Sequence, residues 1–198
     1  MGCKEKQNNT EHSCVDKQLP GDYFPAFPKS WWNYHDLNNN LIKYQISSDY
    51  QEFDGKCYPV LENVTYYQGD KAYVQGNNLL YRYYCGQGAI CRFSSLIYSL
   101  AVDSIITCSI SFSTLNWSHV LPPNIRRVTT KIDTTITVSS RIYQNVIIVK
   151  EYDILNMSQW YLDYFAKNIG LIKRDSISVN DTINLITILT LDNYFIGN

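Results

Sequence analysis

The stretch 160–174, WYLDYFAKNIGLIKR, decides the fold class of this chain. Two alternating apolar runs are joined in it by Asn168-Ile169-Gly170. Asn and Gly tolerate the left-handed backbone conformations that a short connection between antiparallel strands requires. The stretch therefore predicts a β-hairpin.

Alternation along this hairpin also predicts which side chains share a face, because successive strand residues point to opposite sides. One face is expected to carry Trp160, Leu162, Tyr164 and Ala166, and the other Tyr161, Asp163, Phe165 and Lys167. Lys167 and Lys173 suit a binding site, but a charged outer face explains them at least as well. The stretch indicates architecture and gives no sign of catalytic chemistry.

The rest of the chain repeats the pattern of short alternating runs between clusters of Gly, Asn and Asp. The 17 tyrosines and the many Ile, Val and Thr residues suit a pleated, half-buried surface. Strands are predicted over 31–34, 41–50, 57–67, 72–75, 79–85, 104–113, 127–139, 142–151 and 183–191. The run 127–139 is expected to have one wet face. For 93–102 the periodicity does not separate a strand from a short helix.

These runs predict a mostly-β fold, a single domain over 20–198 of about ten antiparallel strands in a meander. Residues 1–19 are polar, lack hydrophobic periodicity and are predicted to form a flexible tether.

Cys3 within this tether admits three interpretations. A Cys followed by a charged, Asn-rich spacer is typical of the first residue of a mature bacterial lipoprotein, and an acyl anchor there would hold the protein on a membrane. N-myristoylation at Gly2 requires Ser or Thr at position 6, which is Lys6. The third interpretation is an incidental cysteine.

Charge and motifs exclude several classes of function. Charged residues make up 18% and the net charge is −1, so nucleic acid is not an expected partner. No run of 18 apolar residues predicts a transmembrane helix, and we expect no signal peptide in the sequence as given. G-x-S-x-G, H-E-x-x-H and Gly-rich phosphate motifs are missing from the sequence. We therefore expect no enzyme activity, no catalytic residues, no metal and no cofactor.

The six cysteines suit an oxidising compartment. Cys85 and Cys91 flank a loop with two glycines and are the predicted disulfide pair. Cys57 and Cys108 lie on strand-like runs and either pair across the sheet or remain buried free thiols.

The aromatic residues also have two interpretations. Trp31, Trp32, Trp117 and Trp160 could, with the tyrosines, stack against sugars or line an apolar pocket. The simpler interpretation is that they fill the core and edges of a sheet as cross-strand pairs.

Two motifs resemble those of Bacteroidetes-type lipoproteins and secreted proteins of unknown function. The opening Tyr23-Phe24-Pro25 with Trp32-x-Tyr34 resembles their YFP…WxY start, and 164–173, YFAKNIGLIK, their closing YFAKxIGLIK signature. The resemblance implies a curved antiparallel sheet or half-barrel. It supplies no catalytic residues.

Together these features predict a non-enzymatic lipoprotein of the cell envelope, anchored to the membrane through Cys3. It is expected on the periplasmic or surface side of the outer membrane, or secreted. The expected partner is an apolar ligand or an envelope protein bound on the curved sheet. The alternative is a carbohydrate-binding or adhesive module that uses exposed Trp and Tyr.

Overall fold

The computed structural model describes residues 14–53, 55–62, 71–75, 78–84, 90–96, 105–107, 109–110, 125–153, 159–178 and 181–198. Within these ranges the chain forms fifteen β-strands and no helix. In chain order they are β1 Trp31–Asp36, β2 Leu41–Ile46, β3 Gln51–Phe53, β4 Lys56–Tyr58, β5 Val60–Glu62, β6 Lys71–Gln75, β7 Asn78–Tyr84, β8 Ile90–Leu96, β9 Ile105–Thr107, β10 Ser109–Ile110, β11 Ile125–Val138, β12 Arg141–Asp153, β13 Gln159–Ala166, β14 Gly170–Ser178 and β15 Asp181–Phe195.

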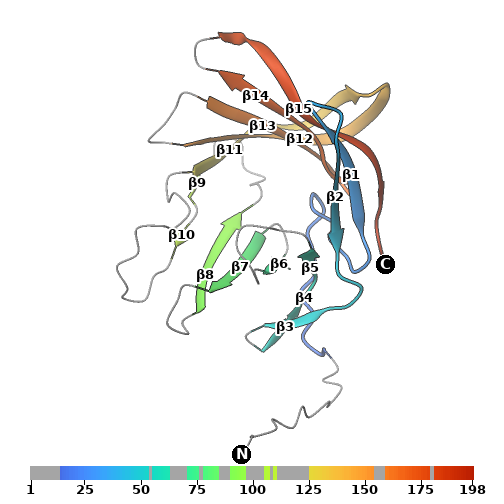
Figure 1. The fold of residues 1–198 in the computed structure, drawn as a ribbon, viewed down its shortest axis with the longest axis vertical. Coiled ribbons are helices and arrows are strands. Elements are labelled where there is room, and N and C mark those ends of the chain that lie inside the picture. The colour runs from blue at the N-terminus through green and yellow to red at the C-terminus, as the bar shows by residue number, and fades with distance from the viewer. Residues whose placement is uncertain are drawn as a thin grey trace, which may run out of the picture.

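Thirteen strands form one antiparallel sheet in the order β10-β8-β7-β6-β5-β2-β1-β15-β14-β13-β12-β11-β9. β3 and β4 form a separate hairpin. Figure 1 shows that the large sheet is strongly curved, with β11–β15 in one wall and β6–β8 in another. The predicted curved antiparallel sheet is confirmed.

The meander is interrupted where the last strand meets the first. β15 lies between β1 and β14. Trp31, the first residue of β1, pairs with Phe195, the last residue of β15. The two walls are therefore joined by a pairing between opposite ends of the chain. Sequence-local signals such as turns do not predict this pairing.

Several predicted strands differ in length from the observed ones. The predicted strand 57–67 is two short strands, β4 and β5, because Pro59 lies between them and proline cannot donate a ladder hydrogen bond. Residues 63–67 lie outside the described residues. In the ambiguous run 93–102, the described part belongs to strand β8, and residues 97–102 are outside the description.

The hairpin of 160–174 is formed by β13 and β14, as predicted. Asn168 and Gly170 have positive φ values of 60° and 103°. The turn is also held from outside, because the Trp32 Nε1–H donates to the Ile169 carbonyl at 2.5 Å and the Asn168 N–H donates to the Asp22 carbonyl at 2.6 Å. These contacts connect the C-terminal hairpin to the N-terminal part of the domain.

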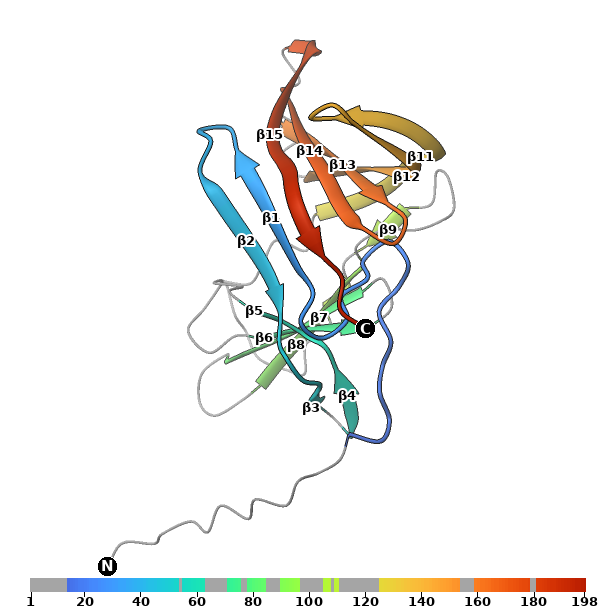
Figure 2. The same cartoon turned by 90° about the vertical axis from the view of Figure 1, so that its right-hand side faces the viewer.

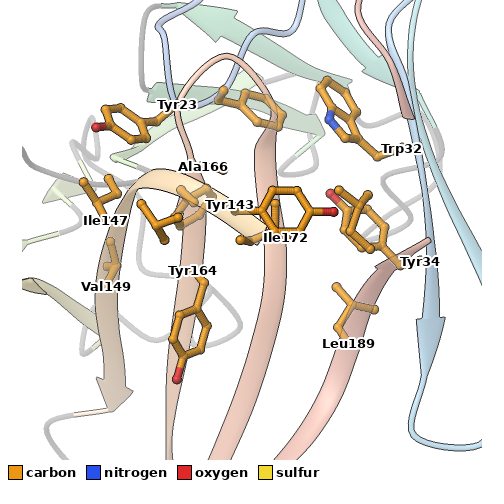
Figure 3. Close-up of a cluster of buried hydrophobic side chains, with 14 of the residues drawn as sticks. Tyr23, Trp32, Tyr34, Tyr143, Ile147, Val149, Tyr164, Ala166, Ile172 and Leu189 are labelled. Carbon is orange, nitrogen blue, oxygen red and sulfur yellow. The ribbon is translucent and has the colours of Figure 1, made fainter. Parts of the chain in front are cut away.

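Asp163 was predicted to share a face with Lys167, but this part of the face does not meet water. Its side chain is buried, with only 1% of the residue exposed. Both faces of β12–β14 are covered, because Ile147 and Val149 are buried on the Asp163 face while Ile148 and Tyr164 are buried on the opposite one. Figure 3 shows side chains from β1 and β12–β15 gathered in this core.

Alternation along β11 is also broken. The register with β12 shifts at three places, and Asp133 has a positive φ of 51°. Strict alternation along the predicted strand 127–139 would place Ile132 on one face with Val128 and Ile136, but Ile132 is 42% exposed. Bulges of this kind insert extra residues and rotate the following side chains to the other face.

The folded part of the chain begins before residue 20, inside the segment predicted as a tether. Cys14 forms a disulfide with Cys57 of β4, so Cys57 does not pair with Cys108. Next to the disulfide, the Cys57 N–H donates to the Asp16 carbonyl at 2.9 Å and the Gln18 N–H donates to the Cys57 carbonyl at 2.7 Å. Residues 14–18 are thus held against β4.

Candidate binding faces of the C-terminal sheet

Arg174 of β14 lies at the centre of a charged cluster on one face of β12–β14. Its Nε donates to Asp163 Oδ1 at 2.5 Å, and its Nη2 donates to Asp163 Oδ2 at 2.7 Å and to Glu151 Oε1 at 3.2 Å. Its guanidinium carbon lies 5.1 Å from the Tyr161 ring centroid. We name Arg174, Asp163, Glu151 and Tyr161 the arginine cluster.

The electrostatics of the arginine cluster are those of a satisfied ion pair. Burial alone would lower the pKa of Arg174, but Asp163, and then Glu151 and Tyr44, raise it above its usual value. Bidentate pairing of a guanidinium with a carboxylate is among the stronger polar contacts in proteins. The cluster therefore joins three strands.

A second cluster lies on the opposite face of the same strands. Lys173 and Asp175 form an ion pair of 2.8 Å between Nζ and Oδ2, and Asp175 also accepts a hydrogen bond of 2.8 Å from the Thr187 hydroxyl. Lys173 lies 5.2 Å from the Tyr164 ring centroid. Burial, followed by the hydrogen bond and charge of Asp175, raises the pKa of Tyr164 well above its usual value.

Lys150 and two aromatic rings extend this face toward β12. The Lys150 Nζ lies 3.8 Å from the Trp160 ring centroid and 5.5 Å from that of Tyr152. The register places Tyr152 opposite Trp160, and Lys150 opposite Leu162. A cation at this distance occupies one face of the Trp160 ring.

Neither cluster has the geometry of a catalytic centre. Asp163 is engaged by Arg174 and is buried, and Asp175 is fully buried beside Lys173. No group of three or more His, Cys, Asp or Glu side chains suited to a metal occurs in the described part of the chain. Both clusters are best explained as polar contacts that hold β12–β15 together.

Where its side chains are described, around β1 and β12–β15, the interior of the sheet is filled by the protein's own residues. Trp32, Tyr34, Ile172 and Leu191 are each at most 1% exposed. Trp32 stacks on Phe24 with 5.5 Å between ring centroids, and the Tyr34 hydroxyl donates to the Leu171 carbonyl at 3.0 Å. Burial, with Tyr44 and Asp163 nearby, raises the pKa of Tyr34 well above its usual value.

Four of the exposed apolar side chains lie on elements at one end of the sheet. Leu37 and Leu41, in and beside the β1–β2 turn, are 64% and 61% exposed. Leu185 and Ile186 of β15 are 51% and 52% exposed. They lie beyond the paired part of β1, which ends where Asp36 pairs with Leu189 of β15. Figure 2 shows the β1–β2 and β14–β15 turns at the end of the molecule opposite β3 and β4. We name Leu37, Leu41, Leu185 and Ile186 the distal patch.

The residues singled out from the sequence are only partly described. Cys3 and Cys85 lie outside the described residues, and for Cys91 only the backbone, in β8, is described. Among the tryptophans, Trp32 is a core residue, Trp31 and Trp160 are partly exposed, and Trp117 lies outside the described residues. Trp32 thus lacks the open ring expected of a sugar-stacking platform because it is buried, and Lys150 occupies one face of the Trp160 ring.

Arg174 and the Cys14–Cys57 disulfide were missed by sequence reasoning. A regular hairpin about the Asn168 turn would place Asp163 opposite Lys173, so the sequence does signal a cross-strand ion pair. In the structure, Ile172 is an extra residue in β14, and Asp163 faces Arg174. The bulge therefore selects which cation is paired.

None of the described residues belongs to a helix long and apolar enough to cross a membrane. No family model matches the chain, and no curated protein matches it. The chain is similar to the crystal structure of a protein assigned as a lipoprotein from Parabacteroides distasonis, with 15% identity, a TM-score of 0.44, and coverage of 90% of this chain and 100% of that one. It is also similar to a protein assigned as exported, with a YmcC-like fold, from Bacteroides fragilis, with 8% identity, a TM-score of 0.38, and coverage of 91% and 100%.

Proposed function

We propose that this protein is a non-enzymatic component of the cell envelope, anchored through a lipid on Cys3, that binds a partner protein. The Cys14–Cys57 disulfide supports an exported location, because such bonds persist in oxidising compartments and are rare in the cytosol. The lipoprotein-like spacing of Cys3 in the polar N-terminal segment supports the anchor.

The filled interior around β1 and β12–β15, the part of the sheet whose side chains are described, is the observation that favours a protein partner over an apolar ligand. A carrier of apolar molecules needs an open cavity lined by apolar side chains. Here Trp32, Tyr34 and Ile172 occupy the interior, and each makes its contacts within the protein. This packing supports binding on the outside of this part of the sheet.

The distal patch offers a protein partner an exposed apolar surface. Four large aliphatic side chains, each more than half exposed, lie at one end of the sheet. Their burial by a partner would contribute about 1 to 2 kcal/mol each from the apolar area removed from water. The patch also lies far from the Cys14–Cys57 disulfide, and an anchor at Cys3 would leave it directed away from the membrane.

Photo-crosslinking in the cells that produce the protein tests the partner. A photoreactive residue at Leu41 or Leu185 is expected to give one covalent adduct of constant mass with another envelope protein. The same residue at Lys56, exposed in β4 at the opposite end, serves as the matched control and is expected to give no such adduct. Equal adducts from all three positions, or none from the distal patch, would exclude this function.

Mass analysis of the N-terminal peptide tests the anchor separately. The peptide that contains Cys3 is expected to carry acyl chains, and a Cys3→Ala variant is expected to lose them and leave the membrane fraction. An unmodified Cys3 in the membrane-bound protein would refute the anchor without affecting the crosslinking result.

A further inference from the structure

The end of the molecule opposite the distal patch carries an unusual apolar surface. Val15 is 87% exposed and Leu19 is 64% exposed, on either side of the residues that pair with β4. Among the described residues at this end, these two large aliphatic side chains are the most exposed. Removal of such exposed aliphatic side chains from water by a partner is favourable in free energy.

The segment that carries them is held rigidly. The Cys14–Cys57 disulfide fixes its start, and Lys17 forms a parallel bridge with Cys57. The Lys17 ammonium lies 5.1 Å from the Tyr50 ring centroid. Val15 and Leu19 therefore keep a defined position relative to the β3–β4 hairpin.

The chain length toward Cys3 limits how far this surface can lie from an acyl anchor. Cys3 precedes Cys14 by 11 residues, which span at most about 40 Å when fully extended and about 20 Å as a flexible coil. The disulfide thus shortens the connection between the anchor and the folded domain. It also makes the β3–β4 end, rather than Pro20, the point of attachment.

We propose that Val15 and Leu19 contact the interfacial region of the membrane, so that the protein stands on its β3–β4 end. This inference rests on the proposed anchor at Cys3. Two aliphatic side chains are too few to bind a membrane by themselves, but an anchored chain presents them at a high local concentration. The charged residues nearby are of both signs: Lys17 and Lys56 are positive, and Asp16, Asp49 and Glu52 are negative. Insertion therefore depends on the aliphatic side chains rather than on attraction to anionic lipid.

An environment-sensitive fluorescent residue tests the contact in the full-length acylated protein. With the protein bound to vesicles of phosphatidylethanolamine and phosphatidylglycerol, a probe at position 15 or 19 is expected to shift its emission to shorter wavelength. A probe at Leu37, in the β1–β2 turn, is the matched control and is expected to show no shift. Removing the anionic lipid is expected to leave the shift at position 15 unchanged.

Energy transfer to an acceptor in the lipid headgroups tests the orientation. A donor at Lys56 is expected to transfer several-fold more efficiently than a donor at Leu37, and Cys14→Ser with Cys57→Ser is expected to reduce this difference. Acylated protein without a shift at position 15, or with equal transfer from both donors, would overturn the inference and leave the anchor intact. Absence of acyl chains on Cys3 would instead overturn both proposals.

Discussion

Gly170 is the residue at which the β13–β14 hairpin and the N-terminal strand meet. Its φ of 103° lies in a region that residues with a Cβ adopt only with strain. A Cβ there would also lie 3.3 Å from Trp32 Nε1, whose hydrogen bond to Ile169 holds the turn. One glycine therefore satisfies both a backbone and a packing requirement.

We predict that Gly170→Ala destabilises the protein by about 2 to 4 kcal/mol, from backbone strain and displacement of Trp32. Gly55→Ala is the matched control, because Gly55 has a φ of 75° and nothing within 4 Å of an added Cβ. It should cost about 1 kcal/mol. Urea unfolding measures both, and equal losses would show that the contact with Trp32 is unimportant.

Arg174 is the residue whose loss leaves a buried charge. We predict that Arg174→Met lowers the free energy of unfolding by about 3 to 5 kcal/mol, because Asp163 would remain buried without a cation. Lys167→Met, which breaks the exposed ion pair with Asp22, should change it by less than about 1 kcal/mol. A small effect of Arg174→Met in chemical unfolding would mean that water reaches Asp163.

At the scale of elements, the β1–β2 turn depends on one carboxylate. Asp36 accepts hydrogen bonds from the Asn38 N–H at 2.9 Å, the Asn40 N–H at 2.7 Å and the Asn40 side-chain amide at 2.9 Å. These bonds, those from Asn40 first, hold the pKa of Asp36 below its usual value. They also order the turn that carries Leu37 of the distal patch.

The lowered pKa predicts the direction of a pH effect on this turn. A carboxylate with a depressed folded-state pKa contributes its stability above the unfolded pKa of about 4, and the contribution is lost as the pH falls through the folded-state value. The amide resonances of Asn38 and Asn40 should therefore shift together below pH 4. In Asp36→Asn the same titration should be absent, and a titration that persists would assign the effect to another group.

At the scale of the whole molecule, the Cys14–Cys57 disulfide joins the N-terminal segment to the body of the domain. It closes a stretch of 43 residues that includes β1, β2 and β3. A cross-link over this length stabilises the folded state by at most about 4 kcal/mol on chain-entropy grounds. The stability of the domain is thus coupled to the redox state of its compartment.

We predict that the double variant Cys14→Ser, Cys57→Ser loses about 2 to 4 kcal/mol of unfolding free energy. Reduction of the unmodified protein should lower its urea midpoint to that of the variant. If reductant lowers the midpoint further, a second disulfide, such as Cys85–Cys91, also contributes. No change in either experiment would contradict a structural role for this bond.

The sequence by itself determined the local features of this protein. Strands β11 and β12 follow from long alternating runs, and the β13–β14 hairpin follows from Asn168 and Gly170, because turn and strand preferences depend on neighbouring residues. The curved antiparallel sheet was expected from the resemblance. The proposals for Cys3 and for Cys85 with Cys91 remain predictions.

Only the tertiary structure decided which residues meet over long sequence distances. The insertion of β15 beside β1, the partner of Cys57, and the burial of Asp163 all depend on contacts between segments far apart in the chain. The choice of Arg174 over Lys173 depends on a single bulged residue, Ile172, which shifts the register of the hairpin. Alternation predicts that a strand has two faces, but the packing of other segments decides whether either face meets water.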